Sequence, residues 1–344
     1  MVSIELKNIT KSFNNNKVID NISFSVEKGE MVSILGPSGC GKTTTLKIIA
    51  GLVKPDSGEI FFNGGSVLHT PVEKRGGVLV FQDFLLFPHL NVEENIGFGL
   101  KMAGVKKNER KKVVAEMLKL VQLEGYEEKY PRELSGGQKQ RVAFARALAV
   151  KPKVLLLDEP FSNLDTRLRE TMREFTCEIQ RKLGITTILV THDKEEALMS
   201  SDRIIVLLDG KIKQSGTPTE VYFKPACLRV AKFFGHKNFI EGIVRNGVLS
   251  TAMGNYPIQG IENGDYQIMI RHEEIKLKKG TENSAGIVER SWFAGERTYY
   301  IVKVKDFSLH CIEKQNKIFA EGEKVDVVID FNEGVFFKKE NYCR

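Results

Sequence analysis

Short apolar runs that end in polar turns recur along the first two-thirds of the chain. The runs at 31–35, 154–157 and 187–190 have the length and composition of buried strands. The first run leads through a glycine-rich turn into a helical pattern at 42–50, which ends at Gly51, a residue favoured just past a helix end. Strands that alternate with helices in this way predict an α/β unit with parallel strands and crossover helices.

Two further segments extend this pattern. A fourth apolar run, at 204–208, is followed by Asp209-Gly210, a pair typical of tight hairpin turns. Residues 92–148 carry lysine and glutamate on the polar faces of apolar stretches, so this region is predicted to be almost wholly helical.

The pattern changes after residue 239. Apolar and polar residues alternate at 266–270, 300–304 and 325–329, and Asn246-Gly247 stands between two short β-rich runs. Several short strands of this kind predict a small β-barrel or sandwich. We therefore expect an α/β domain to be followed by an all-β domain.

Composition agrees with two globular domains, at residues 1–238 and 239–344. Of the 344 residues, 42% are hydrophobic and 28% charged, which argues against a disordered or fibrous protein. The formal charge of +7 suits an anionic ligand and is equally common in proteins without one. No apolar run approaches the roughly 18 residues of a membrane span, and no export signal is visible. The five cysteines form no CxxC pair, which favours reduced thiols inside a cell over disulfides or a zinc site.

The glycine-rich turn carries a motif with a defined chemistry. Residues 36–43, GPSGCGKT, match the pattern GxxxxGK[ST] between a predicted strand and a predicted helix, which is the context that a phosphate-binding loop requires. Its glycines allow backbone N–H groups to surround phosphate oxygens, and the helix N-terminus adds partial positive charge. Lys42 would contact the β- and γ-phosphates, and the Thr43 hydroxyl would hold Mg²⁺.

Two carboxylates follow the strand predicted at 154–157. Asp158 and Glu159 end that strand beside the phosphate-binding loop, where one carboxylate can bind the metal and the other can polarise the attacking water. We assign the metal to Asp158 and the water to Glu159. Two solvated carboxylates at a strand end are the alternative, which the neighbouring loop disfavours.

A second anion-binding feature lies between these motifs. Residues 134–138, LSGGQ, run into an alanine-rich helical stretch. A serine and two glycines at a helix start provide hydroxyl and backbone N–H donors. Taken alone, these residues would also suit an ordinary capped helix.

Together the motifs resemble those of the ATP-binding cassette (ABC) family. The resemblance extends over about residues 3–235 and rests on the order of the motifs, in which LSGGQ is the family's signature sequence. Gln82, Asp165 and His192 match the family's Q-loop, D-loop and switch histidine. Phe13 falls where the family carries an aromatic residue that stacks on adenine, although core packing would also explain a phenylalanine there.

This resemblance implies a P-loop NTPase fold of the α/β class, with a helical subdomain at about 88–152, and a role for each matched residue. The catalytic residues would be Glu159, His192 and Gln82. Mg²⁺ would be bound by Thr43, Gln82 and Asp158. ATP would be bound within the chain by Phe13, Gly36, Pro37, Ser38, Gly39, Cys40, Gly41, Lys42, Thr43 and Thr44. The ATP of a partner subunit would be contacted by Ser135, Gly136, Gly137, Gln138 and Asp165.

The partners follow from the same resemblance. Only one cassette is present, whereas the family completes each ATP site with the signature residues of a second subunit, so a homodimer is implied. Two transmembrane permease subunits and, through the complex, an external solute-binding protein are also implied, with this chain on the cytoplasmic face of the cell membrane. The stretch 84–90 would help form a groove for a helix of the membrane subunit; equally, Phe84 and Phe87 would suit a core.

The C-terminal region narrows the expected function. From about residue 240, including the run at 270–277, it resembles the OB/TOBE-like β-barrel regulatory domain of importer ATPases for sugars, polyamines, ferric iron, sulfate and molybdate. We therefore expect an ATP-hydrolysing subunit that energises import of a small solute, namely an inorganic ion, a polyamine or a sugar.

Two other ABC-type functions are weighed against import. A DNA-repair or chromosome ATPase would split the cassette with a long coiled coil, which does not occur between Gly36 and Glu159. A translation factor of the superfamily would carry two cassettes. We therefore expect no nucleic-acid partner.

Overall fold

The computed structural model describes residues 2–82, 86–235, 238–314 and 319–339. By its contacts, the chain divides into two compact units, Met1–Val221 and Tyr222–Arg344. No helix in the described part of the chain has the length and hydropathy of a membrane span.

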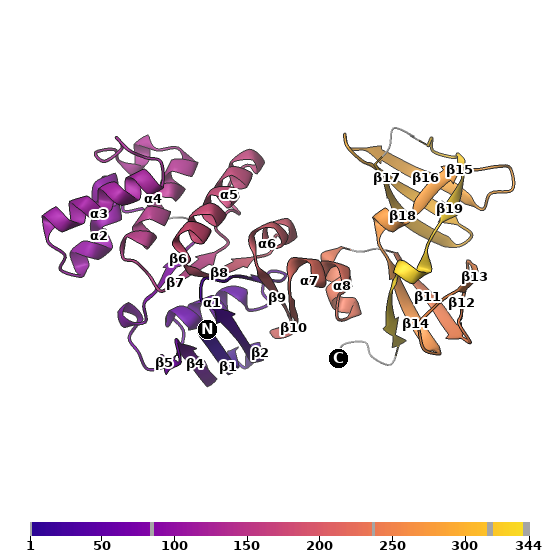
Figure 1. The fold of residues 1–344 in the computed structure, drawn as a ribbon, viewed down its shortest axis with the longest axis horizontal. Helices are drawn as coiled ribbons and strands as arrows, with labels where there is room; N and C mark the ends of the chain where they lie inside the picture. The colour runs from indigo at the N-terminus through magenta and orange to yellow at the C-terminus, as the bar shows by residue number, and fades with distance from the viewer. Residues whose placement is uncertain (1, 83–85, 236–237, 315–318, 340–344) are drawn as a thin grey trace. The chain divides into compact units, whose positions relative to one another are not determined.

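A six-stranded sheet with the order β10-β9-β3-β8-β7-β6 forms the centre of the first unit (Figure 1). Its strands are β3 (Met31–Leu35), β6 (Gly77–Val80), β7 (Val154–Asp158), β8 (Thr186–Thr191), β9 (Arg203–Leu208) and β10 (Lys211–Gly216). All neighbouring pairs are parallel except β9 and β10, which are joined by a turn at Asp209-Gly210, where both residues have positive φ. The predicted parallel strands and the hairpin are confirmed.

Both faces of this sheet are buried, which explains why its strands are continuously apolar. Side chains along a strand alternate between the two faces. On β7, Leu155 and Leu157 pack in one core with α5 (Thr166–Leu183), whereas Leu156 packs in a second core with α1 (Lys42–Ala50).

The topology assembles three of the sequence motifs at one edge of the sheet. Strands β3, β8 and β7 are neighbours and parallel, so their carboxyl ends lie side by side. The loop at 36–41 leaves β3, Asp158-Glu159 lies at the end of β7, and His192 follows β8. Sites in open parallel sheets lie at this edge, which is why motifs far apart in the chain meet here.

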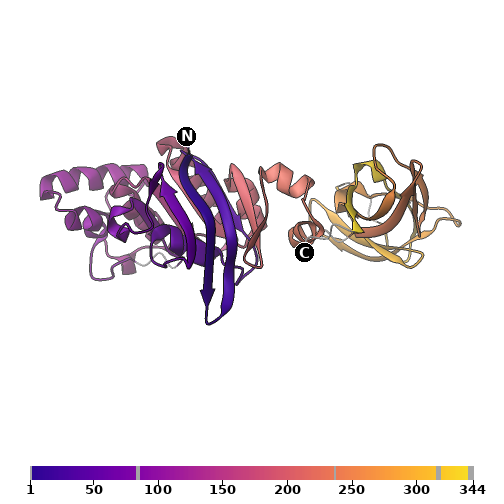
Figure 2. The same ribbon diagram turned by 90° about the horizontal axis from the view of Figure 1, so that it is seen from below.

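An antiparallel sheet with the order β2-β1-β4-β5, which the sequence patterns above do not predict, completes the first unit. Its strands are β1 (Val2–Phe13), β2 (Asn16–Glu27), β4 (Ser57–Phe62) and β5 (Gly65–Ser66). Figure 2 shows β1 and β2 side by side as a long hairpin. Asn14 and Asn15 form its turn with positive φ, a conformation that asparagine tolerates.

A helical subdomain lies at one end of the first unit (Figure 1). Its helices are α2 (Val92–Met102), α3 (Lys107–Leu120) and α4 (Gly136–Ala149). The prediction of a nearly continuous helical stretch at 92–148 is wrong for residues 121–135, which form turns and a short 3₁₀ helix. Gln122 and Gly125 have positive φ, and the ring of Pro131 fixes its own φ, so α3 cannot continue through this segment.

Two antiparallel five-stranded sheets form most of the second unit. One sheet contains β11 (Asn238–Arg245), β12 (Val248–Thr251), β13 (Gly254–Pro257), β14 (Gly264–Ile270) and β20 (Val335–Lys338). The other contains β15 (Lys276–Lys279), β16 (Gly286–Phe293), β17 (Thr298–Val304), β18 (Phe307–Glu313) and β19 (Lys324–Val328). Val244 and Ile268 of the first sheet share a core with Val288 and Val302 of the second. The sequence predicted a small β-barrel or a sandwich, and two sheets that share a core correspond to the sandwich. The OB/TOBE type of this domain stays a prediction.

The short helices before β11 divide between the two units. The last helix, α8 (Leu228–Phe234), belongs with the second unit, because Ala231 packs against Met269 and Phe337. The preceding helix, α7 (Pro218–Phe223), begins just before the division of the units at Val221. The boundary predicted at 238/239 coincides with the start of β11 and lies 17 residues after the observed division of the units at 221/222.

Candidate functional site

The loop between β3 and α1 has a backbone shape that its glycines require. A Cβ on Gly36 would lie 2.2 Å from the carbonyl oxygen of Leu207. Gly41 caps α1 with a φ of 103°, and a Cβ there would lie 2.7 Å from the carbonyl oxygen of Val18. Side chains are therefore excluded at both ends of the loop, whereas Ser38 between them is exposed.

Lys42 lies inside this loop. Its side chain is buried, and its Nζ donates hydrogen bonds to the carbonyl oxygens of Gly36 at 2.8 Å and Pro37 at 2.9 Å. The ammonium group is thus held where the backbone of the loop curves. Among the residues that the structure describes, the hydrogen-bond partners of this buried charge are neutral carbonyl groups, so it is well placed to attract an anion.

The other residues of the loop differ in exposure. Gly39 is exposed, and Thr44 in the first turn of α1 is half-buried. Cys40 is buried, and burial raises the pKa of its thiol above the ordinary value. This thiol therefore stays protonated and acts as a small apolar filler.

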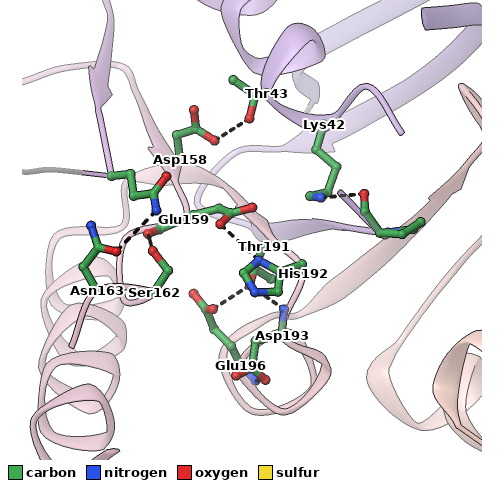
Figure 3. Close-up of polar contacts among 12 residues, drawn as sticks. Lys42, Thr43, Asp158, Glu159, Ser162, Asn163, Thr191, His192, Asp193 and Glu196 are labelled. Atoms are coloured by element: carbon green, nitrogen blue, oxygen red, sulfur yellow. Dashed lines mark hydrogen bonds and ion pairs between the residues drawn. The ribbon is translucent and has the colours of Figure 1, made fainter. Parts of the chain in front are cut away.

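Thr43 and Asp158 contact each other across the site. The hydroxyl of Thr43 donates a hydrogen bond to Asp158 Oδ1 at 2.9 Å (Figure 3). Burial raises the pKa of the Asp158 carboxyl, a change that the Thr43 hydrogen bond partly offsets. A hydroxyl and a poorly solvated carboxylate are oxygen ligands of the kind that Mg²⁺ prefers, and a cation would compensate for the lost solvation. The donor set therefore fits the metal that the family implies.

Gln82 lies at the exposed side of the same region. Its Nε2 is 3.5 Å from Oδ1 of Asn163, in the segment that leads to Asp165. Asp165 is itself exposed and caps α5, accepting a hydrogen bond from the Leu168 N–H at 3.0 Å. The structure thus brings Gln82 next to the D-loop, with its side chain accessible.

Glu159 and His192 form a direct pair. Nδ1 of His192 lies 3.0 Å from Oε2 of Glu159 (Figure 3). Glu159 has a φ of 47°, an uncommon conformation for this residue type. Its N–H donates to the Val190 carbonyl at 2.8 Å, and its own carbonyl accepts a hydrogen bond from the Ser162 hydroxyl at 3.0 Å. These backbone bonds hold an uncommon conformation at a functional edge, as is frequent in active sites.

Residues around His192 that sequence reasoning missed complete this region. Asp193 caps α6 (Lys194–Ser200), and the buried Glu196 accepts a hydrogen bond from the Thr191 hydroxyl at 2.6 Å. Arg169 lies 3.6 Å from Asp193 and donates to the carbonyl of Leu164 in the D-loop.

Among the described residues, the signature residues at 135–138 form hydrogen bonds within the helical subdomain and not with the phosphate-binding loop of the same chain. Ser135 caps α4, and Ser135 and Gln138 form a capping box with bonds of 2.9 and 3.3 Å. Gln138 also donates to the Tyr126 hydroxyl. Ser135 and Gly136 are exposed, whereas Gly137 is buried against Leu168. The exposed end of α4 therefore presents its donors outward.

Phe13 stands at the end of β1 with 46% of its surface exposed. Nζ of Lys11 lies 5.3 Å from the centroid of its ring. That lysine is held by Asp56 at 2.7 Å. Core packing therefore does not account for Phe13, and its contact with adenine stays a prediction.

An apolar groove of about 430 Å³ opens beside β6 in the same unit. It is lined by Val78, Leu79, Val80, Phe81, Phe87, Phe98, Gly99, Ala143, Arg146, Ala147 and Val150. The ring of Phe87 lies 4.4 Å from that of Phe98, and the guanidinium of Arg146 lies 5.1 Å from Phe87. Phe87 thus lines a groove wall, and Phe84 lies outside the described residues.

Comparison with known proteins agrees with this geometry. The ABC transporter family profile matches residues 19–162. The Fe(3+) ions import ATP-binding protein FbpC of Pasteurella multocida is 46% identical over 80% of this chain and 81% of its own length. The chain belongs to the ABC transporter family. The spermidine/putrescine import ATP-binding protein PotA of Mesoplasma florum is also 46% identical, with the same coverage of each chain.

A solved ABC structure is similar as well. The ATP-binding cassette MJ0796, described as a dimeric post-hydrolysis state bound to ADP and Pi, is 34% identical with a TM-score of 0.56. It covers 62% of this chain and 98% of its own. This ABC protein therefore binds ATP and is the ATPase subunit of an importer. The predicted fold class and ATPase activity are confirmed. The comparisons favour an importer subunit over the alternative of a chromosome ATPase.

Proposed function

We propose that this ABC ATPase hydrolyses ATP with Glu159 and His192 and thereby drives uptake of ferric ions. The contact of 3.0 Å between these two side chains, beside the loop that holds Lys42, is the observation that supports the proposal most directly. It pairs a carboxylate that can accept a proton with an imidazole that can orient it.

The reaction assigns a task to each of these groups. The Glu159 carboxylate accepts a proton from a water molecule while the water oxygen forms a bond to the γ-phosphorus of ATP. The bond from that phosphorus to the oxygen bridging the β- and γ-phosphates breaks, and ADP and phosphate leave. His192 orients Glu159 and the γ-phosphate, and Lys42 with the N–H groups of the loop stabilises the phosphate charge.

Mg²⁺ supplies charge neutralisation to the phosphates when it is bound. Thr43 and Asp158 would hold it, joined by the side-chain carbonyl of Gln82. The exposed position of Gln82 lets this residue respond to movement of a partner. Phe13 would stack on the adenine ring, for which its exposed face is suited.

The complete ATPase site requires a second copy of this chain in our proposal. Ser135 and Gly136 are exposed, and their bonds remain within the helical subdomain, so they are available to the ATP of a partner subunit. Asp165, also exposed, would contact the partner near the same site. The dimeric state of the solved relative supports this arrangement.

The groove beside β6 is proposed to receive a helix of a permease subunit. It is apolar, it lies next to Gln82 in the chain, and Phe81 exposes 46% of its surface there. Two permeases on a homodimer would hold the chain at the cytoplasmic face of the membrane, with a solute-binding protein reached only through the complex.

Ferric ions are the proposed solute because relatives named for Fe(3+) import are 45–47% identical to this chain. A polyamine is the second candidate, because PotA of Mesoplasma florum is as similar to this chain as FbpC of Pasteurella multocida is. Uptake of radioactive ferric ion and of labelled spermidine by cells with and without this gene separates the two. Loss of spermidine uptake alone would overturn the ferric assignment.

The assignment of Glu159 is tested by Glu159→Gln. The amide keeps the shape of the side chain but cannot accept the proton, so ATP binding should persist while hydrolysis stalls. Glu170→Gln, an exposed change on α5, serves as the matched control. Turnover at the wild-type rate in Glu159→Gln would remove Glu159 from the mechanism.

A further inference from the structure

The buried carboxyl group of Glu196 lies in the first turn of α6, four residues after His192. Glu196 is 4% exposed, and its Oε2 accepts a hydrogen bond from the Thr191 hydroxyl at 2.6 Å. Its other oxygen, Oε1, has no hydrogen-bond partner among the residues that the structure describes. A buried carboxyl group with one unsatisfied oxygen is costly, so its presence calls for an explanation beyond packing.

The hydroxyl of Thr191 joins the two ends of the His192 turn. It donates to Glu196 and accepts a hydrogen bond from the N–H of Asp193 at 2.9 Å (Figure 3). The residues before and after His192 are therefore tied to each other and to the first turn of α6. His192 itself is half exposed and makes its contact with Glu159 from this tied turn.

Helix capping does not explain Glu196. Asp193 already caps α6, because its Oδ1 accepts hydrogen bonds from the N–H groups of Glu195 and Glu196. The side chain of Glu196 instead turns back to β8 and bonds Thr191. Its effect falls on the turn between the strand and the helix.

The charges around Glu196 favour its neutral form. Burial raises the pKa of its carboxyl to about 7, and the negative charges of Asp193 and Glu159 add to this effect. The bond from Thr191 and the positive charge of Arg169 act in the opposite direction. A neutral carboxyl next to Glu159 and the triphosphate also avoids a further negative charge where anions gather.

We propose that Glu196 is a positioning residue that holds the His192 turn, through Thr191, in the place where His192 meets Glu159. This inference rests on the proposed roles of Glu159 and His192. It assigns to a buried glutamate of α6 a part in keeping the catalytic pair together. A displacement of about 1 Å in such a pair lowers turnover by roughly a hundredfold.

The test measures steady-state ATPase activity of the full chain with four substitutions. Glu196→Leu removes the acceptor, and Thr191→Val removes the hydroxyl while keeping the β-branched shape that suits β8. Glu196→Gln keeps a neutral acceptor of the same size. Glu195→Gln, an exposed change on the same helix, is the matched control.

The expected result is a fall in kcat of roughly 10- to 100-fold for Glu196→Leu and Thr191→Val, with KM for ATP changed much less. Glu196→Gln should restore most of the activity below pH 7. Above pH 7 the Glu196 carboxyl of the wild type ionises and adds a negative charge near Glu159, whereas the glutamine stays neutral. The kcat of Glu196→Gln divided by the kcat of the wild type should therefore rise from about pH 6 to about pH 8.5. Circular dichroism confirms that each variant is folded at the assay temperature.

The outcomes separate this inference from the proposed function. Wild-type kcat in a folded Thr191→Val variant, or a constant ratio of Glu196→Gln to wild type across pH, would overturn the role of Glu196. If Glu159→Gln is inactive in the same assay, the proposed function stands despite that failure. If Glu159→Gln is active, the mechanism itself fails.

Discussion

Replacing Glu196 by glutamine should raise the stability of the first unit at alkaline pH. Burial and the neighbouring charges of Asp193 and Glu159 raise the pKa of the Glu196 carboxyl from 4.5 to about 7, against the opposing effects of Thr191 and Arg169. The folded chain therefore binds this proton more tightly than the unfolded chain. The free energy of unfolding falls as pH rises from about 4.5 to about 7, because the unfolded chain gains the favourable ionisation of this carboxyl while the folded chain still holds it protonated.

The size of the effect follows from the change in pKa. At about 1.4 kcal/mol for each pH unit, the wild type loses about 3 kcal/mol of stability over this interval. Glutamine cannot ionise, so Glu196→Gln escapes the loss. The difference in unfolding free energy between variant and wild type should grow by about 2–3 kcal/mol from about pH 5 to about pH 8.

Urea unfolding at these two pH values measures the difference. Helical circular dichroism follows the first unit, which contains α1 to α6, and fluorescence of Trp292, the single tryptophan, follows the second unit. The change should appear in the circular dichroism transition and not in the fluorescence transition. Glu195→Gln should show neither, because its side chain is exposed. A difference that varies by less than about 1 kcal/mol between the two pH values would refute the reasoning.

Three further substitutions test the site. Lys42→Ala removes the buried ammonium beside the phosphates, at a cost of roughly 3 kcal/mol in the transition state, so ATPase activity should fall by more than a hundredfold; an unchanged rate would contradict its role. Ser135→Arg should abolish hydrolysis while the single subunit still binds a fluorescent ATP analogue. Mixing it with Lys42→Ala subunits should restore part of the activity, and no recovery at all would count against a composite site. Gly36→Ala forces a Cβ to 2.2 Å from a backbone oxygen, so its thermal midpoint should drop, whereas Gly65→Ala, with its nearest neighbour at 3.6 Å, should leave the midpoint unchanged.

Sequence patterns predict the parallel sheet well because each of its strands is buried on both faces. The apolar runs that became β3, β7 and β8 are continuous, without the alternation of a half-exposed strand, and a polar turn follows each of them. The antiparallel β1–β2 hairpin is harder to predict, because its pairing shifts register at several points and its strands are long and half-exposed. The end of α3 depends on a positive φ at Gln122, and a glutamine in a sequence gives no indication of this conformation.

The candidate site shows the same division. Lys42, Thr43 and Asp158 could be predicted because their motifs specify local backbone shape: a loop closed by glycines and a carboxylate at a strand end. Glu196 could not be singled out in this way, since a glutamate on a short helix is ordinarily exposed. Its burial follows from the packing of α6 against β3 and β8.

The amino-acid sequence by itself determined the phosphate-binding chemistry, the alternation of strand and helix, and the change to short strands near residue 239. Local backbone preference and side-chain type are sufficient for those features. Only the tertiary structure decided that His192 meets Glu159 and that Thr191 and Glu196 tie the turn between them. The contact of His192 with Glu159 depends on β7 and β8 lying next to each other in the sheet. The burial of Glu196 beside Thr191 depends on the packing of α6 against β3 and β8, and both follow from the packing of the whole unit.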